Sequence, residues 1–205
     1  MKSDGVCILN RFLLGELLVS PPSDSELPSL YKGFDSKNNI DVIIKIWRRQ
    51  QNLYDGDLEV IWRSEIHLLQ RLSGYPGGRE YLIPMLDAGS DPNGFYLILQ
   101  SDQLLPMQCY IQQSPSTPSP HSKHLFWSNI RRLAKGLGLI HSHGLIHRNL
   151  DEWAIFTDGG ENPNYKLGGF EWSIRLCSQG LNEVVQPKSN NETEVNAPRT
   201  TSTKI

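Results

Sequence analysis

The chain has few cysteines and lacks any long apolar run. Its 205 residues include three cysteines, Cys7, Cys109 and Cys177, which lie far apart and form no Cys-x-x-Cys pair. This spacing is typical of free thiols rather than of a disulfide framework or a zinc motif. No segment reaches the ~20 apolar residues of a membrane span, and MKSDGVCILNR (1–11) lacks the apolar core of a signal peptide. We therefore expect a soluble cytoplasmic protein that does not associate with membranes.

An excess of charge of either sign is missing as well. The 20 Lys and Arg residues nearly balance the 22 Asp and Glu residues, which leaves a formal net charge of −2. Because nucleic acids and anionic membranes attract basic surfaces, the composition favours neither partner. Aromatic residues are absent from 178–205, where Asn, Thr and Ser are frequent, and we expect a disordered tail there.

The first hundred residues predict strands around one helix. FLLGELLVS (12–20) reads as a strand, PPSDSELPS (21–29) breaks any strand ladder, and 30–48 predicts a hairpin with its turn at 36–39. Apolar residues then recur at spacings of three and four over 57–72, which predicts an amphipathic helix. Two more strands, EYLIPMLDAG and GFYLILQ, flank the turn at 90–93.

The second part predicts a long helix and a strand pair. A proline-containing loop at 114–122, with three Ser/Thr-Pro steps, precedes a helix over 124–144 that ends at Gly144. The expected apolar positions of this helix are Leu125, Phe126, Ile130, Leu133, Leu137 and Ile140. Two short strands are expected around the Gly/Asn-rich turn within 156–172.

Four segments resemble motifs of protein kinases. Val42-Ile43-Ile44-Lys45 is similar to the Val-Ala-Ile-Lys strand, and Glu65 follows on the inner face of the predicted helix. YLILQSD (96–102) resembles the hinge, HGLIHRNLDEWAIF (143–156) the catalytic loop, and KLGGFEW (166–172) the Asp-Phe-Gly segment. The order and spacing of these segments resemble the protein kinase superfamily, in a degenerate form whose large lobe looks truncated.

The resemblance implies an α+β, bilobal fold. A β-rich small lobe and hinge would span 1–102, and the first part of a helical large lobe would span 103–177. It also implies site roles for particular residues. Lys45 and Glu65 would form an ion pair at the ATP site, Leu99 would be the gatekeeper beside the hinge residues Gln100 and Ser101, and His147, Arg148 and Phe170 would be structural.

The positions that carry the family's chemistry have changed. Asn149 stands where a catalytic aspartate would orient the attacking hydroxyl, and it cannot accept a proton as a carboxylate does. Ala154 and Gly169 stand where the family has its two metal ligands, and neither side chain can hold Mg²⁺. The prolines in SPPSDSELPS (20–29) cannot donate backbone N–H groups to phosphates. We expect Glu171, two residues past Gly169, to be a solvated charge on a loop.

These departures predict a pseudokinase that acts as a binding or scaffolding module for a protein partner. We expect weak or absent ATP binding, no Mg²⁺ and no other metal ion. One alternative is an atypical ATP-dependent kinase whose metal site is rebuilt from Glu171 and Asp151, and another is a partial gene product without independent function. A metal site formed by His141, His143 and His147 is a further alternative, although no cysteine or carboxylate pattern completes it.

Overall fold

The computed structural model describes residues 6–21, 26–49, 55–111, 120–159 and 163–176, and they form an α+β fold. The expected loop at 114–122 lies largely outside these ranges, and the expected tail at 178–205 lies wholly outside them. None of the described helices is long and apolar enough to span a membrane. The helices are α1 (Asp55–Ser73), α2 (Gly78–Tyr81), α3 (Gln108–Ile111) and α4 (Pro120–Ser142). The strands are β1 (Cys7–Ile8), β2 (Phe12–Val19), β3 (Ser29–Asp35), β4 (Ile40–Arg48), β5 (Met85–Asp91), β6 (Gly94–Gln100), β7 (Leu105–Pro106), β8 (Leu145–Ile146), β9 (Ile155–Thr157), β10 (Lys166–Leu167) and β11 (Ile174–Arg175).

A six-stranded antiparallel sheet, in the order β1-β2-β3-β4-β6-β5, forms the first part of the fold. Its two central strands, β4 and β6, are buried on both faces, as their continuous apolar sequences indicate. Side chains alternate between the faces of a strand, so Ile43, Lys45 and Trp47 share one face while Val42 and Ile44 point the other way. Lys45 is therefore placed by strand geometry on the face that carries most of the core.

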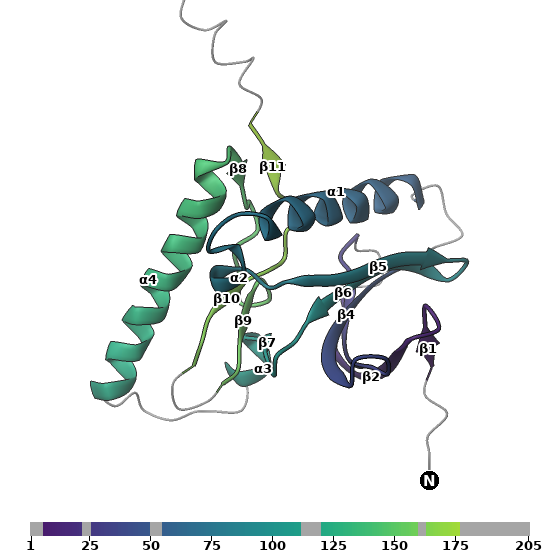
Figure 1. Cartoon of the computed structure of the whole chain (residues 1–205), viewed down its shortest axis with the longest axis horizontal. Coiled ribbons are helices and arrows are strands. Elements are labelled where there is room, and N and C mark those ends of the chain that lie inside the picture. Colours follow the sequence, from purple (N-terminus) through teal and green to yellow (C-terminus); the bar gives the residue numbers. More distant parts are fainter. Residues whose placement is uncertain (1–5, 22–25, 50–54, 112–119, 160–162, 177–205) are drawn as a thin grey trace, which may run out of the picture.

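Helix α1 packs along this face of the sheet (Figure 1). Leu58, Leu69 and Leu72 are buried, at spacings that follow the helical period. The indole Nε1 of Trp62 donates a hydrogen bond to the carbonyl oxygen of Tyr96, 2.9 Å away, and so ties the helix to β6. Glu65 lies on the inner side of α1 and is fully buried. The predicted strands, hairpin and helix of this part are confirmed, except that the segment EYLIPMLDAG begins in the short helix α2.

Helix α4 lies beside the β9–β10 pair, on the far side of that pair from the sheet (Figure 1). Gly144 follows the helix with a left-handed φ of 71°, and its N–H bonds to the carbonyl of His141 at 2.9 Å. This is the glycine terminator that the sequence predicts. The inner face of α4 is narrower than expected. Leu133 and Ile140 are buried, but Phe126 and Ile130 are exposed, so their assignment to the apolar stripe was wrong.

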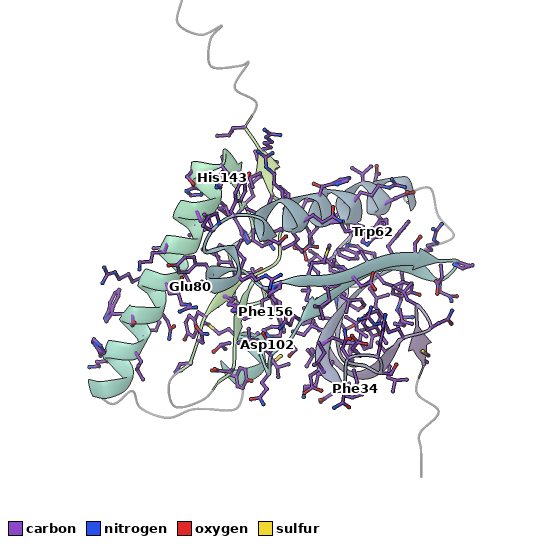
Figure 2. The ribbon with its side chains drawn as sticks, in the orientation of Figure 1. Phe34, Trp62, Glu80, Asp102, His143 and Phe156 are labelled. Atoms are coloured by element: carbon purple, nitrogen blue, oxygen red, sulfur yellow. The ribbon has the colours of Figure 1, made fainter. Side chains whose placement is uncertain are left out.

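One hydrophobic core joins the sheet to the later elements. Leu97 and Leu99 of β6, Leu72 of α1, Ile140 of α4 and Phe156 of β9 belong to the same buried cluster. Phe156 lies near the middle of the molecule (Figure 2). The core therefore crosses residue 102, where the sequence suggested a boundary between lobes. A smaller cluster, which includes Phe12, Ile44 and Ile98, fills the other face of the sheet.

The sheet curls until its two edges meet. The three-residue turn between β1 and β2, Leu9 to Arg11, has positive φ angles at Leu9 and Asn10, as turns that follow the strand twist require. Leu9 packs against the backbone of Gly89 on β5, where an added Cβ would lie 2.6 Å from a Leu9 methyl carbon. Beside this contact, Arg11 Nη1 lies 3.1 Å from Asp87 Oδ2 of β5.

Candidate functional site

A cavity of about 190 Å³ opens between the β2–β3 end of the sheet and the segments that follow α4. Its walls are mainly apolar, and its polar residues come from β4 and from the segments 149–154 and 169–171. The lining residues are Val19, Ser20, Pro21, Leu27, Pro28, Leu30, Lys45, Asn149, Asp151, Trp153, Ala154, Phe156, Gly169 and Glu171. The fold thus gathers several residues that the sequence singled out, although they come from widely separated segments.

Lys45 contacts two carboxylates at the cavity floor. Its Nζ lies 2.8 Å from both carboxylate oxygens of Glu65, which confirms the predicted ion pair between strand and helix. The same Nζ also donates to Oε1 of Glu171. Both glutamates are buried, so the expectation that Glu171 is a solvated loop charge is wrong. The backbone N–H of Phe170 adds a hydrogen bond of 3.3 Å to Glu65 Oε1, which fastens this segment to α1.

The three charges shift the pKa of the groups involved. Burial, together with the negative charge of Glu171, raises the pKa of Glu65 to about 7, although Lys45 acts in the opposite direction. Burial also opposes the charge of Lys45, but the two glutamates outweigh it and raise the pKa of the ammonium. Lys45 therefore stays protonated near neutral pH. With both glutamates ionised, the cluster carries one net negative charge, and this charge adds to the effect of burial on the pKa of Glu65.

Gly169 and Ala154, which stand at the expected metal-ligand positions, lie against each other. A Cβ added at Gly169 would be 2.9 Å from the Ala154 Cβ, and the φ of Gly169 is 68°. Both the close approach and the left-handed backbone favour glycine at this place. The N–H of Gly168 bonds to the Ala154 carbonyl at 2.8 Å and holds the two segments together. Neither side chain can ligate a cation.

His147 and Arg148 begin the segment that leads to Asn149. His147 is buried, and its Nε2 lies 2.8 Å from the carbonyl oxygen of Gly168, so this nitrogen carries the proton that is donated. Burial lowers the pKa of His147 and favours the neutral ring. The ring also packs on Phe170, with 4.9 Å between centroids. Arg148 is exposed and has a left-handed φ of 69°, which is uncommon for a residue with a side chain.

Asn149 and Asp151 bring polar groups to the cavity wall. Asn149, which stands at the expected base position, is half-buried and lines the cavity. Asp151 uses Oδ1 to accept the backbone N–H groups of Trp153 and Ala154, at 3.0 and 2.9 Å. This turn sets the direction of the chain so that Trp153 and Ala154 both reach the cavity.

The expected hinge residues do not reach the cavity. Leu99 is fully buried between its strand partners Ile43 and Met85. The backbone N–H of Gln100 bonds to the carbonyl of Pro84 at 2.8 Å, and that of Ser101 points at the carbonyl of Asp41, 3.4 Å away. Both of these donors are therefore occupied within the chain.

The histidines considered as an alternative metal site make different contacts. His147 bonds to Gly168, whereas His143 stacks on Tyr75 with 3.5 Å between ring centroids. Within the described ranges, no three His, Cys, Asp or Glu side chains are grouped so that they could hold a metal ion.

The role of Glu171 was not predicted from the sequence. A signal was present, because Glu171 lies between Phe170 and Trp172 and follows two glycines, in a segment too apolar for a solvated loop. What the sequence could not supply was the partner, since Lys45 is more than a hundred residues away. No protein-family model matches the chain, and a comparison with curated proteins found no match either.

Proposed function

We propose that this chain is a protein-kinase-like domain that does not transfer phosphate and acts by binding. The observation that carries the proposal is the contact of Glu171 with Lys45. In the protein kinase superfamily, the lysine at this position contacts the α- and β-phosphates of ATP. Here its ammonium is held by two buried carboxylates, so a phosphate would have to displace Glu171 and then lie beside its negative charge.

The neighbouring positions support the same proposal. Catalysis of phosphoryl transfer requires metal ions that neutralise the charge on the phosphoryl oxygens. Ala154 and Gly169 offer no ligand, and an aspartate at Gly169 would meet both a strained φ and the Ala154 methyl group. Asn149 can orient a hydroxyl but cannot take its proton. Binding function is supported by Phe126 and Trp127, two exposed aromatic side chains on α4 that could meet a protein partner.

A second candidate is a kinase with a rebuilt metal site, since Glu171 and Asp151 line one cavity. This candidate needs Glu171 to leave Lys45. The geometry favours the first proposal, because breaking a buried ion pair leaves an unpaired charge.

The test is incubation with labelled ATP, a generic protein substrate and either Mg²⁺ or Mn²⁺. We expect no labelled phosphate on the chain or on the substrate. Lys45→Met is the matched variant, because it removes the ammonium but keeps a long side chain. Labelling by the parent chain that this variant abolishes would show that the chain is a kinase and that our proposal is wrong.

A further inference from the structure

Lys45 offers no free N–H group to a molecule in the cavity. An ammonium has three hydrogen-bond donors, and Nζ reaches three oxygens, namely both of Glu65 and Oε1 of Glu171. Among the described residues that line the cavity, Lys45 is also the only basic one. An anionic ligand would therefore find no available cationic donor on the described walls.

One carboxylate oxygen of Glu171 accepts no hydrogen bond from the described residues. Its Oε1 is bound to Lys45, while no described residue donates a hydrogen bond to Oε2, which faces Gly169, about 3.5 Å from the place of an added Cβ. The side chain is 7% exposed and lines the cavity. Asp151 lines the same cavity with a second carboxylate. The charged side chains of the lining are thus one lysine and two carboxylates, which leaves a net charge of −1 before Glu65 is counted.

The rest of the wall suits a compact and apolar group. Trp153 and Phe156 line the cavity together with aliphatic and proline side chains. An aromatic ring attracts a cation that lies over its face. At about 190 Å³ the cavity is smaller than the ~300–1,000 Å³ typical of sites for drug-sized ligands. It has room for a fragment-sized molecule rather than for a nucleoside triphosphate.

We propose that this cavity binds a small apolar ligand that carries a positively charged nitrogen, such as an amine or an amidine. The nitrogen donates to Oε2 of Glu171, and the apolar body lies against Trp153 and Phe156. This inference rests on the proposed function, since it assigns to the cavity a ligand in place of ATP. It goes further in naming the chemical class and the residue that selects it.

The test compares two probes of nearly the same shape, benzamidine and benzamide, which differ in charge. Their binding to the full chain is measured by isothermal titration calorimetry and by ligand-observed NMR. We expect benzamidine to bind at least tenfold more tightly than benzamide. Glu171→Gln keeps the size of the side chain but removes the charge, and we expect it to abolish the preference. Glu59→Gln is the matched control, because Glu59 pairs with Arg63 on the exposed side of α1, and it should keep the preference.

The possible outcomes separate the two proposals. Equal binding of the two probes, no binding of either, or displacement of benzamidine by micromolar ATP would overturn the inference about the ligand. None of these binding results would show that the chain is a kinase. Kinase activity is measured separately, by the labelled-phosphate assay. If Glu171→Gln fails to fold, as judged by circular dichroism, the comparison of the two probes on the parent chain still decides. Transfer of labelled phosphate would overturn the proposed function and the inference with it.

Discussion

Glu171 adds a second carboxylate to an ammonium that Glu65 already neutralises. Taking charges out of water is costly, and the attraction between them compensates only when the geometry is good and the remaining polar groups are hydrogen-bonded. Here two negative groups share one positive partner in a buried place. Burial, together with this excess negative charge, favours the protonated form of Glu65, so the pKa of Glu65 rises although Lys45 acts to lower it.

This arrangement predicts a dependence of stability on pH. The pKa of Glu65 is about 7 in the folded chain, above its ordinary value of 4.5. The folded state therefore binds more protons than the unfolded state between these values, and its stability falls as pH rises from about 4.5 to 7. We expect this group to contribute a loss on the order of 1–3 kcal/mol. Urea denaturation at pH 5 and at pH 7 measures the change.

Glu171→Gln should reduce that loss, because it removes one of the two causes that raise the pKa of Glu65 and leaves burial as the other. His147 is a second group that titrates nearby. Its lowered pKa makes stability rise with pH, and the loss of the Glu171 charge strengthens this trend, so both groups change in the same direction. Glu59→Gln should retain the parent dependence. Identical slopes for the parent and Glu171→Gln would show that the two carboxylates do not interact.

Asp35 gives the opposite pH dependence. Its carboxylate is fully buried and receives hydrogen bonds from Arg11 and from the turn that follows β3. The Arg11 guanidinium lowers the pKa of Asp35 to about 2. Stability from this group is complete above its ordinary pKa of 3.8 and is lost as pH falls towards 2.

Asp35→Asn should therefore lower the melting temperature at pH 6 and weaken its fall between pH 4 and 2. Asp87→Asn is the matched control, since Asp87 binds the same arginine but its side chain is 40% exposed. We expect a much smaller effect from this control. Equal melting temperatures of the two variants at pH 6 would show that the buried Asp35 does not stabilise the fold more than the exposed Asp87.

Among the elements, those with a clear period could be predicted from the sequence. β4 and β6 have unbroken apolar runs, and α1 has apolar residues at helical spacings, so local patterns were sufficient. The outer face of α4 was harder to predict from the sequence, because Phe126 and Ile130 fit the same helical period as the buried residues. Their exposure depends on which neighbours the helix meets, and periodicity does not contain that information.

The cavity could be predicted only in part. Lys45 and Glu65 follow from a strand and a helix that are close in sequence, whereas Glu171 reaches them through the tertiary fold. The hinge positions were chosen by resemblance, but Leu99 is turned into the core between neighbouring strands. Which face of a strand meets a cavity depends on how the later segments fold back over it.

The turn at Gly169 allows a direct test of the backbone geometry. Gly169→Ala forces a side chain into a left-handed φ and towards Ala154, and we expect a loss of roughly 1–2 kcal/mol. Gly138→Ala is the control. An added Cβ at Gly138 in α4 meets nothing within 4 Å, and alanine should stabilise the helix there by up to ~1 kcal/mol. Urea denaturation measures both, and equal effects of the two changes would contradict the geometry.

The same backbone strain applies to variants designed to introduce catalysis. The triple variant Asn149→Asp, Ala154→Asn and Gly169→Asp would introduce the residue types that active protein kinases have at the positions which these residues occupy under the proposed function. We expect it to be less stable than the parent and to show no transfer of labelled phosphate. Glu171 still holds Lys45, and the asparagine at 154 competes for the space that an aspartate at 169 needs. Transfer at an ordinary kinase rate, roughly 1–100 per second, would show that these contacts do not matter.

For the molecule as a whole, the shared core predicts cooperative unfolding. Phe156 and Ile83 belong to the same buried cluster and both lie against Gly168. Phe156 therefore links the part of the chain before residue 102 to the part after it. Phe156→Ala should cost about 3–5 kcal/mol, as do other buried phenylalanines. Tryptophan fluorescence and far-ultraviolet circular dichroism should follow one coincident transition in both the parent and the variant. Two separate transitions would show that the parts on either side of residue 102 unfold independently.

The curled sheet also affects the tendency of the chain to associate with other copies through its sheet edges. An open sheet leaves two outer strands whose unpaired N–H and C=O groups can recruit strands from other molecules. Here the β1–β2 turn is held against β5 by Leu9 and Arg11, so each edge partly covers the other. Arg11 bonds to Asp35 and Asp87, and we expect its contact with β5 to reduce association through the sheet edges. Changes at the β1–β2 turn should reduce the yield of monomer before they alter the cavity.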